Sequence, residues 1–196
     1  MKFLAVVLVL LAAAGGGVYL LTQPAGGVGP VTPSSAAVIR AEAKIFAAFT
    51  AAGATAVISR HPVQATVNLT DDELTSLVAS RLAQSQSSVS NVVLVGSSDG
   101  VFRTTADVLW NGWTFHVYAT GTVTFGSDGS VHLDVHDADV GRLPLPSSVV
   151  DAIVAQNSGA TTVNVPPGIS DLALQPVAGG ATLTGMVSPD VRRLVP

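Results

Sequence analysis

The dipeptide Asn111-Gly112 constrains the fold more than any other feature, because it separates two long runs of alternating apolar and polar residues. Asn-Gly favours a two-residue type I′ turn, and such a turn fixes the register of the hairpin that it closes. Trp110 then pairs with Trp113, and the following pairs keep apolar residues on one face and polar residues on the other. The apolar face carries Phe102, Ala106, Val108, Trp110, Trp113, Phe115 and Val117.

A second turn, at Ser127–Gly129, extends this hairpin to a third strand. A three-residue loop pairs Phe125 with Val131 and continues the apolar face, whereas a two-residue loop would mix the two faces. Asp137 and Asp139 then fall on the apolar face, so we expect the third strand to leave the core near Asp137. The pattern predicts an α+β fold in which a long, curved antiparallel β-meander packs against helices.

The stretch 35–52 is predicted to form a helix that packs on this sheet and ends near Gly53. Arg40 and Lys44 fall on the side of this helix opposite to its apolar stripe. The stripe consists of Val38, Ile39, Ile45, Phe46 and Phe49.

A second helix is predicted to follow the alternating strand Val63–Leu69. Thr70 has the position of the N-cap and Glu73 that of N3, which together form a capping box. Asp71 and Asp72 lie at the positive end of the helix dipole. The three acidic residues also suggest a cation site, but capping accounts for all of them.

The N-terminal stretch Phe3–Leu21 is an uninterrupted apolar run. As a helix it would span roughly 28 Å, close to the hydrocarbon thickness of a bilayer. We expect residues 1–21 to be a transmembrane anchor with Lys2 in the cytoplasm, a cleaved signal peptide being the alternative. The Pro- and Gly-rich residues 22–34 then form a flexible linker, and residues 35–196 an extracytoplasmic α+β domain at the cell membrane.

Composition excludes several classes of function. The net charge is −4 and only 11% of residues are charged, so nucleic acid is not an expected partner. There is no Cys, which excludes disulfides and thiolate metal sites. The chain has no Gly-x-Ser-x-Gly elbow, phosphate-binding Gly-rich loop or His-Glu-x-x-His motif, so we expect no enzymatic activity and no cofactor.

Two groups of polar residues could suggest chemistry. His132, Asp134 and His136 alternate on one strand, but alternation places the two His about 13 Å apart, too far to share one zinc ion. We therefore expect no metal site there. Asp107 pairs with His116 in the hairpin register, and we interpret this as a surface pair before a catalytic dyad.

The order of motifs resembles a known group. The segments "VNLTDDELTSLV" and "DVGRLPLPSSVVDAIV", on either side of the meander, resemble those of YpmS-like membrane-anchored bacterial envelope proteins, whose activity is unassigned. The closing "PPGISDLALQPVAGGATLTG" is similar to the tail of actinobacterial envelope proteins of the lipid-binding mannan-elongation type. The resemblance implies a tubular lipid-binding type of fold with an apolar groove between sheet and helix, and it provides no catalytic residues.

We therefore expect the apolar face to bind a lipid-like or other apolar ligand. The alternative is a structural or partner-binding module of the cell envelope whose core is closed by its own helices. Expected partners are the membrane, an apolar ligand and an envelope protein. The predicted ligand-binding residues are Phe102, Val108, Trp110, Trp113, Phe115, Val117 and Phe125.

Overall fold

The computed structural model describes residues 28–29, 31–84, 89–110, 112–126, 131–141, 143–144 and 165–190. The predicted membrane anchor at residues 1–21 lies outside these ranges.

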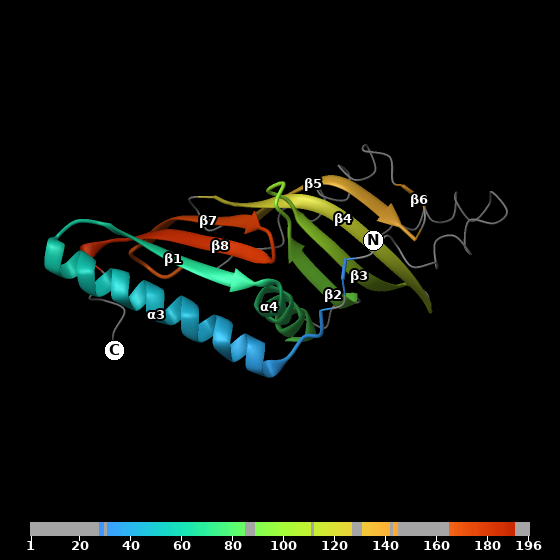
Figure 1. Ribbon diagram of the computed structural model, residues 1–196, viewed down its shortest axis with the longest axis horizontal. Coiled ribbons are helices and arrows are strands. Elements are labelled where there is room, and N and C mark those ends of the chain that lie inside the picture. The colour runs from blue at the N-terminus through green and yellow to red at the C-terminus, as the bar shows by residue number, and fades with distance from the viewer. Residues whose placement is uncertain are drawn as a thin grey trace.

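The described strands form one open antiparallel sheet in the order β1-β8-β7-β4-β3-β2, with β5 paired to β4 and β6 paired to β5. Helices α3 and α4 lie on one side of this sheet, α3 along β1 and β8 and α4 beside β2 (Figure 1). This arrangement confirms the predicted α+β class and the curved β-meander packed against helices. The elements are α3 (Ser35–Ser59), β1 (Val63–Thr70), α4 (Asp71–Gln84), β2 (Val89–Gly96), β3 (Phe102–Trp110), β4 (Trp113–Phe125), β5 (Val131–Val140), β6 (Leu143–Pro144), β7 (Ile169–Val177) and β8 (Gly180–Val187).

The β3–β4 hairpin has the predicted register from end to end. Trp110 pairs with Trp113 and Phe102 with Gly121, and Gly112 has the positive φ of 81° that its turn position requires. The β4–β5 register is also as predicted near its loop, where Phe125 pairs with Val131.

The expectation that β5 leaves the core near Asp137 is wrong. A β-bulge shifts the register after Gly121, so that Asp137 pairs with Thr120 and Asp139 with Tyr118, on the polar face. Gly121 allows the close approach at the bulge, since a Cβ there would lie 2.3 Å from the carbonyl oxygen of Asp134. One extra residue in β5 therefore restores the alternation, and the strand continues to Val140.

Helix α3 is longer than predicted, and part of its predicted apolar stripe packs as expected, since Ile45 and Phe49 contact the core cluster. It continues past Gly53, which is buried, because Ala52 and Ala56 beyond the predicted stripe also face the sheet. Small residues let the helix approach β1 closely. Ile39 and Phe46, which were assigned to the apolar stripe, are 66% and 73% exposed instead.

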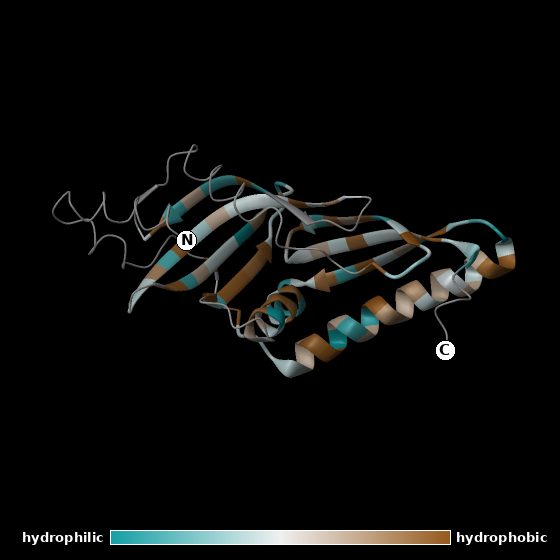
Figure 2. Cartoon of the chain, turned by 180° about the vertical axis from the view of Figure 1, so that it is seen from behind, coloured by the Kyte–Doolittle hydropathy of each residue, from teal (hydrophilic) through white to brown (hydrophobic). Residues whose placement is uncertain are grey.

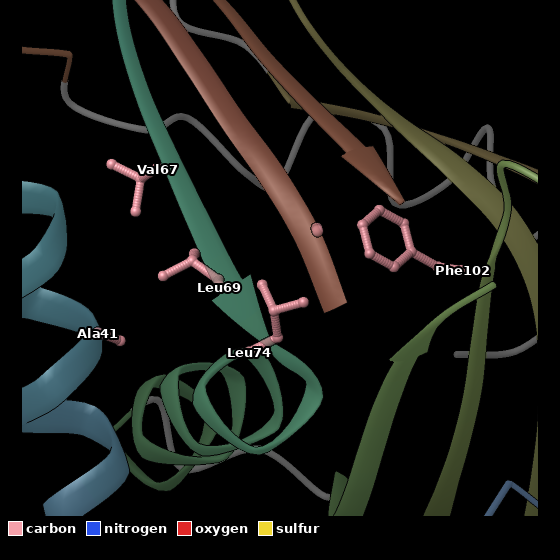
Figure 3. Close-up of a cluster of buried hydrophobic side chains, with 6 residues drawn as sticks. Ala41, Val67, Leu69, Leu74 and Phe102 are labelled. Atoms are coloured by element: carbon pink, nitrogen blue, oxygen red, sulfur yellow. The ribbon is translucent and has the colours of Figure 1, made fainter. Parts of the chain in front are cut away.

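The core lies where α3, α4, β1 and β3 meet. Side chains from these elements form one buried cluster with Ala181 of β8, and Figure 3 shows them converging. Its labelled members are Ala41, Val67, Leu69, Leu74 and Phe102.

Among the described residues, α3 is a helix long and apolar enough to cross a membrane. This property follows from length and composition alone. In the structure, the inner side of α3 packs on β1 and α4.

Candidate functional site

The predicted ligand face is closed at some positions and partly open at others. Phe102 is only 2% exposed, because it packs in the core cluster with Leu74 of α4 and the partly buried Val123 of β4. Phe115 is buried as well. Of the other predicted site residues, Val108, Val117 and Phe125 are half-buried, Trp113 is exposed, and the side chain of Trp110 lies outside the described part.

The partly open residues Val108, Val117 and Trp113 surround the buried Phe115 in the hairpin register. Figure 2 shows apolar residues on β2 beside α4, and β3 and β4 extend beyond both elements toward their turn. Val108 and Val117 lie on this extension, on the apolar side fixed by the hairpin register. The structure thus keeps the predicted residues on one face but buries Phe102 and Phe115.

The end of the hairpin carries an apolar residue that the sequence analysis did not assign to the site. Leu109 pairs with Thr114, so it points to the polar face, whereas Trp113 belongs to the apolar face. Leu109 is 56% exposed and Trp113 54%. The sequence feature that could have identified this residue is an apolar side chain at a polar-face position of the alternation, next to the turn.

The polar face holds a chain of hydrogen bonds across three strands. His116 Nδ1 lies 2.5 Å from Asp107 Oδ1, and the amide of Asn91 donates to Asp107 Oδ2 at 2.8 Å. Asn91 has a positive φ of 49° next to a bulge in β2, a conformation that Asn tolerates better than most residues. The carboxylate therefore orients the imidazole and engages its Nδ1.

Among the described residues, this arrangement supplies a positioned imidazole without a nucleophile bonded to it. Nucleophilic catalysis by a Ser, Thr or Cys requires that nucleophile within hydrogen-bond distance of the His. The described residues contain no such bond to a His116 ring nitrogen in addition to the one with Asp107. The pair is best interpreted as a half-buried structural contact that holds β3 to β4.

The first turn of α4 carries three acidic residues, Asp71, Asp72 and Glu73. The capping box forms as predicted: Thr70 N donates to Glu73 Oε2 at 3.0 Å, and Glu73 N donates to Thr70 Oγ1 at 3.3 Å. Two cations of α3 also reach this turn, with Arg40 Nη2 2.8 Å from Asp72 Oδ2 and Lys44 Nζ 2.8 Å from Glu73 Oε2. Helical periodicity places Arg40 and Lys44 away from the predicted apolar stripe and does not reveal this contact.

The surroundings of Glu73 decide its protonation. Burial acts to raise the pKa of Glu73, but the hydrogen bonds from Lys44 and Thr70 and the charge of Lys44 outweigh burial and lower that pKa below its usual value. The opposite balance holds for Asp71, where burial raises the pKa although Gly96 N donates a hydrogen bond to Asp71 Oδ1 at 2.8 Å. The acidic triplet is thus occupied by structural contacts, which leaves no reason to assign it a cation.

A groove of about 420 Å³ lies between the start of α3 and α4. Its walls come from the segment before α3 and from the two helices, and no strand residue lines it. Ser34 N donates to Ser76 Oγ at 3.0 Å at this junction. The groove therefore differs in place from the expected one, which was to lie between sheet and helix. Its lining includes Pro33, Ser34, Val38, Ile39, Ser76 and Ala79.

Metal-binding side chains do not gather within the described residues. No group of three or more His, Cys, Asp or Glu there could hold an ion. His136 Nε2 is 3.7 Å from Asp134 Oδ2, while the side chain of His132 lies outside the described part.

Comparisons with family models, curated proteins and solved structures find no match to this chain. The resemblance to YpmS-like and lipid-binding envelope proteins therefore rests on the quoted motifs alone.

Proposed function

We propose that this chain is a non-enzymatic, membrane-tethered extracytoplasmic domain that binds a lipid-like or other apolar ligand on β3 and β4. The observation that carries the proposal is the apolar face of β3 and β4, which is covered only in part. Val108 and Val117 remain half-buried there, and Trp113 at its end is exposed. A continuous apolar strip that the protein covers only in part is typical of a binding surface.

Different residues of this face have different roles in the proposal. Phe102 and Phe115 are the closed positions of this face, since both are buried. Val108, Val117 and Phe125 line the surface on which an acyl chain or similar group would lie. Trp113 lies at the outer end, where an aromatic residue can contact both an apolar chain and a polar headgroup.

The tether is assigned to residues 1–21 rather than to α3. The ion pairs of Arg40 with Asp72 and of Lys44 with Glu73 support α3 as an integral element of the domain. A helix that crossed the bilayer would carry these cations into hydrocarbon, at a cost of about 2.5–3.5 kcal/mol each. Residues 28–34 then belong to the linker between membrane and domain.

A second candidate is a structural or partner-binding module of the envelope that takes up no ligand. The filled core between α3, α4, β1 and β8 favours it, because Ala41, Val67 and Leu69 are all buried there. On this reading, the outer face of β3 and β4 contacts another protein.

Uptake of a monomeric lipid tests the proposal. The full-length chain is titrated with a lysophospholipid below its critical micelle concentration, and 1:1 adducts are counted by native mass spectrometry. Val117→Thr places a hydroxyl on the ligand surface at similar volume and should weaken binding about tenfold. Val95→Thr is the matched control, because Val95 is also half-buried but pairs with Arg103 on the polar face.

The two candidates predict different results. A saturable adduct that weakens in the Val117 variant alone supports ligand binding. If no adduct forms with the unaltered chain, the ligand proposal is wrong and the partner-binding module is favoured.

A further inference from the structure

The β3–β4 hairpin ends in large apolar side chains on both faces of the sheet. Leu109 shares the face of Asp107 and His116, and Trp113 shares the opposite face with Phe115. More than half of each side chain is exposed to solvent. The tip therefore differs from the rest of the hairpin, where one face is apolar and the other is polar.

This arrangement does not suit a flat protein partner, which would cover one face and leave the other in water. A medium that surrounds the tip covers both faces at once. The stretch Val108–Phe115 contains no charged residue, so its transfer out of water requires the desolvation of no charge. Trp is also the residue enriched at the interface of lipid bilayers, where its ring contacts acyl chains and its indole N–H contacts headgroups.

Charged groups begin directly behind the tip. Asp107 and His116 form the next pair on the polar face, and they contact each other rather than lying free. An immersed segment would therefore end at this pair, which limits insertion to the turn and three residues from each strand, or roughly 10 Å. That depth matches the boundary between headgroups and acyl chains and does not reach the centre of the bilayer.

The position of the tip relative to the chain entry agrees with a membrane partner. Along the longest axis of the molecule, the segment Val31–Ser34 lies in the half that holds β2 and β5 (Figure 1). Strands β3 and β4 extend further toward the end of this half, whereas α3 runs toward the opposite end. Ser34 is held to α4 by its hydrogen bond to Ser76. A flexible linker of residues 22–34 has an average span of about 20 Å, so a bilayer that holds residues 1–21 lies within reach of the tip.

We propose that the tip of the β3–β4 hairpin, with Leu109 on one face and Trp113 on the other, inserts into the headgroup interface of the bilayer to which the chain is tethered. The inference rests on the membrane tether of the proposed function. It deepens that function, because the open end of the ligand face then meets the bilayer, from which a lipid can enter directly.

The two Trp of the chain make the test direct. Both lie at this hairpin, so intrinsic Trp fluorescence reports on the tip alone. The full-length chain is reconstituted in phosphatidylcholine vesicles that carry bromine either near the glycerol end or near the methyl end of the acyl chains. Shallow bromines are expected to quench the emission, and deep bromines to quench it less.

Two variants locate the contact. Leu109→Asp places a charge on the tip and is expected to reduce quenching at least threefold. Ile58→Asp is the control, because it alters an exposed apolar residue at the far end of α3 and should leave quenching unchanged. Circular dichroism confirms that each variant is folded.

Retention on the vesicles after carbonate extraction tests the tether separately. A chain that is retained but not quenched by either lipid overturns the tip proposal, and so does equal quenching in the Leu109 variant and the unaltered chain. A chain that is quenched but released by carbonate overturns the tether instead and leaves the tip contact supported.

Discussion

Lys44 Nζ lies 2.8 Å from Glu73 Oε2 and so joins the middle of α3 to the first turn of α4. The carboxylate is only 2% exposed, whereas the Lys44 side chain is 44% exposed. The ammonium group therefore keeps part of its hydration while it compensates a buried charge. Most of the cost of breaking this pair would come from the carboxylate that remains.

Lys44→Met is expected to lower the free energy of unfolding by about 1–3 kcal/mol, because it leaves Glu73 with the weaker contact to Arg40 and the hydrogen bonds of Thr70. Urea unfolding followed by circular dichroism measures the change. Lys44→Arg, which keeps the charge, is the control and should lose less. Equal stability of the Met variant and the unaltered chain would show that the pair contributes nothing.

The same pair predicts how stability depends on pH. The pKa of Glu73 is lowered in the folded chain, so its contribution is present above the usual value of 4.5 and is lost as pH falls through the lowered folded value. Glu73→Gln cannot titrate, and its stability should therefore fall less on acidification below about pH 4.5 than that of the unaltered chain. Unfolding curves at neutral and acidic pH test this, and parallel losses in both proteins would refute it.

Asp71 should behave in the opposite way. Burial raises the pKa of Asp71 above 3.8. The stability linked to its protonated form is therefore lost as pH rises through the folded pKa, and at neutral pH the ionised carboxylate lowers the free energy of unfolding. Asp71→Asn keeps an acceptor for Gly96 N and is expected to be as stable as the unaltered chain or more so. Asp71→Ala removes the acceptor and should cost about 1–2 kcal/mol. Thermal unfolding at neutral pH ranks the three proteins, and an Asn variant weaker than the Ala variant contradicts the argument.

Gly121 should tolerate no side chain. A Cβ would lie 2.3 Å from the carbonyl oxygen of Asp134 in the bulged part of β5, and backbone cannot move aside cheaply. We expect Gly121→Ala to destabilise the chain by about 1–3 kcal/mol. Gly100→Ala is the comparison, because it has open space and only the cost of its positive φ of 82°. If Gly121→Ala and Gly100→Ala lower the free energy of unfolding by the same amount, the prediction of a close backbone approach at the bulge is wrong.

Local features of this chain were predictable and distant ones were not. The β3–β4 register predicted from Asn111-Gly112 and the Thr70–Glu73 capping box depend on neighbouring residues, and both are as expected. The end of α3 beyond Gly53 and the bulge opposite Gly121 depend on strands far along the chain, which periodicity does not reveal.

The candidate site shows the same division. Hairpin register identified its face, but packing by elements distant in sequence decides which of its residues remain open. Leu109 escaped notice because alternation assigned it to the polar side, and its 56% exposure cannot be read from its own strand.

The two aromatic residues Trp113 and Phe115 provide a final prediction, because they lie on the same face with very different burial. Trp113 is 54% exposed and Phe115 only 6%. Phe115→Ala should therefore cost about 3–5 kcal/mol, as is usual for a buried aromatic residue. Trp113→Ala removes a larger side chain but should cost only about 1 kcal/mol, since much of its surface is already in water. Urea unfolding read by circular dichroism compares the two variants without depending on Trp emission. A loss at Trp113 as large as that at Phe115 would mean that the tip is part of the core, and neither a ligand nor a bilayer would then be needed to cover it.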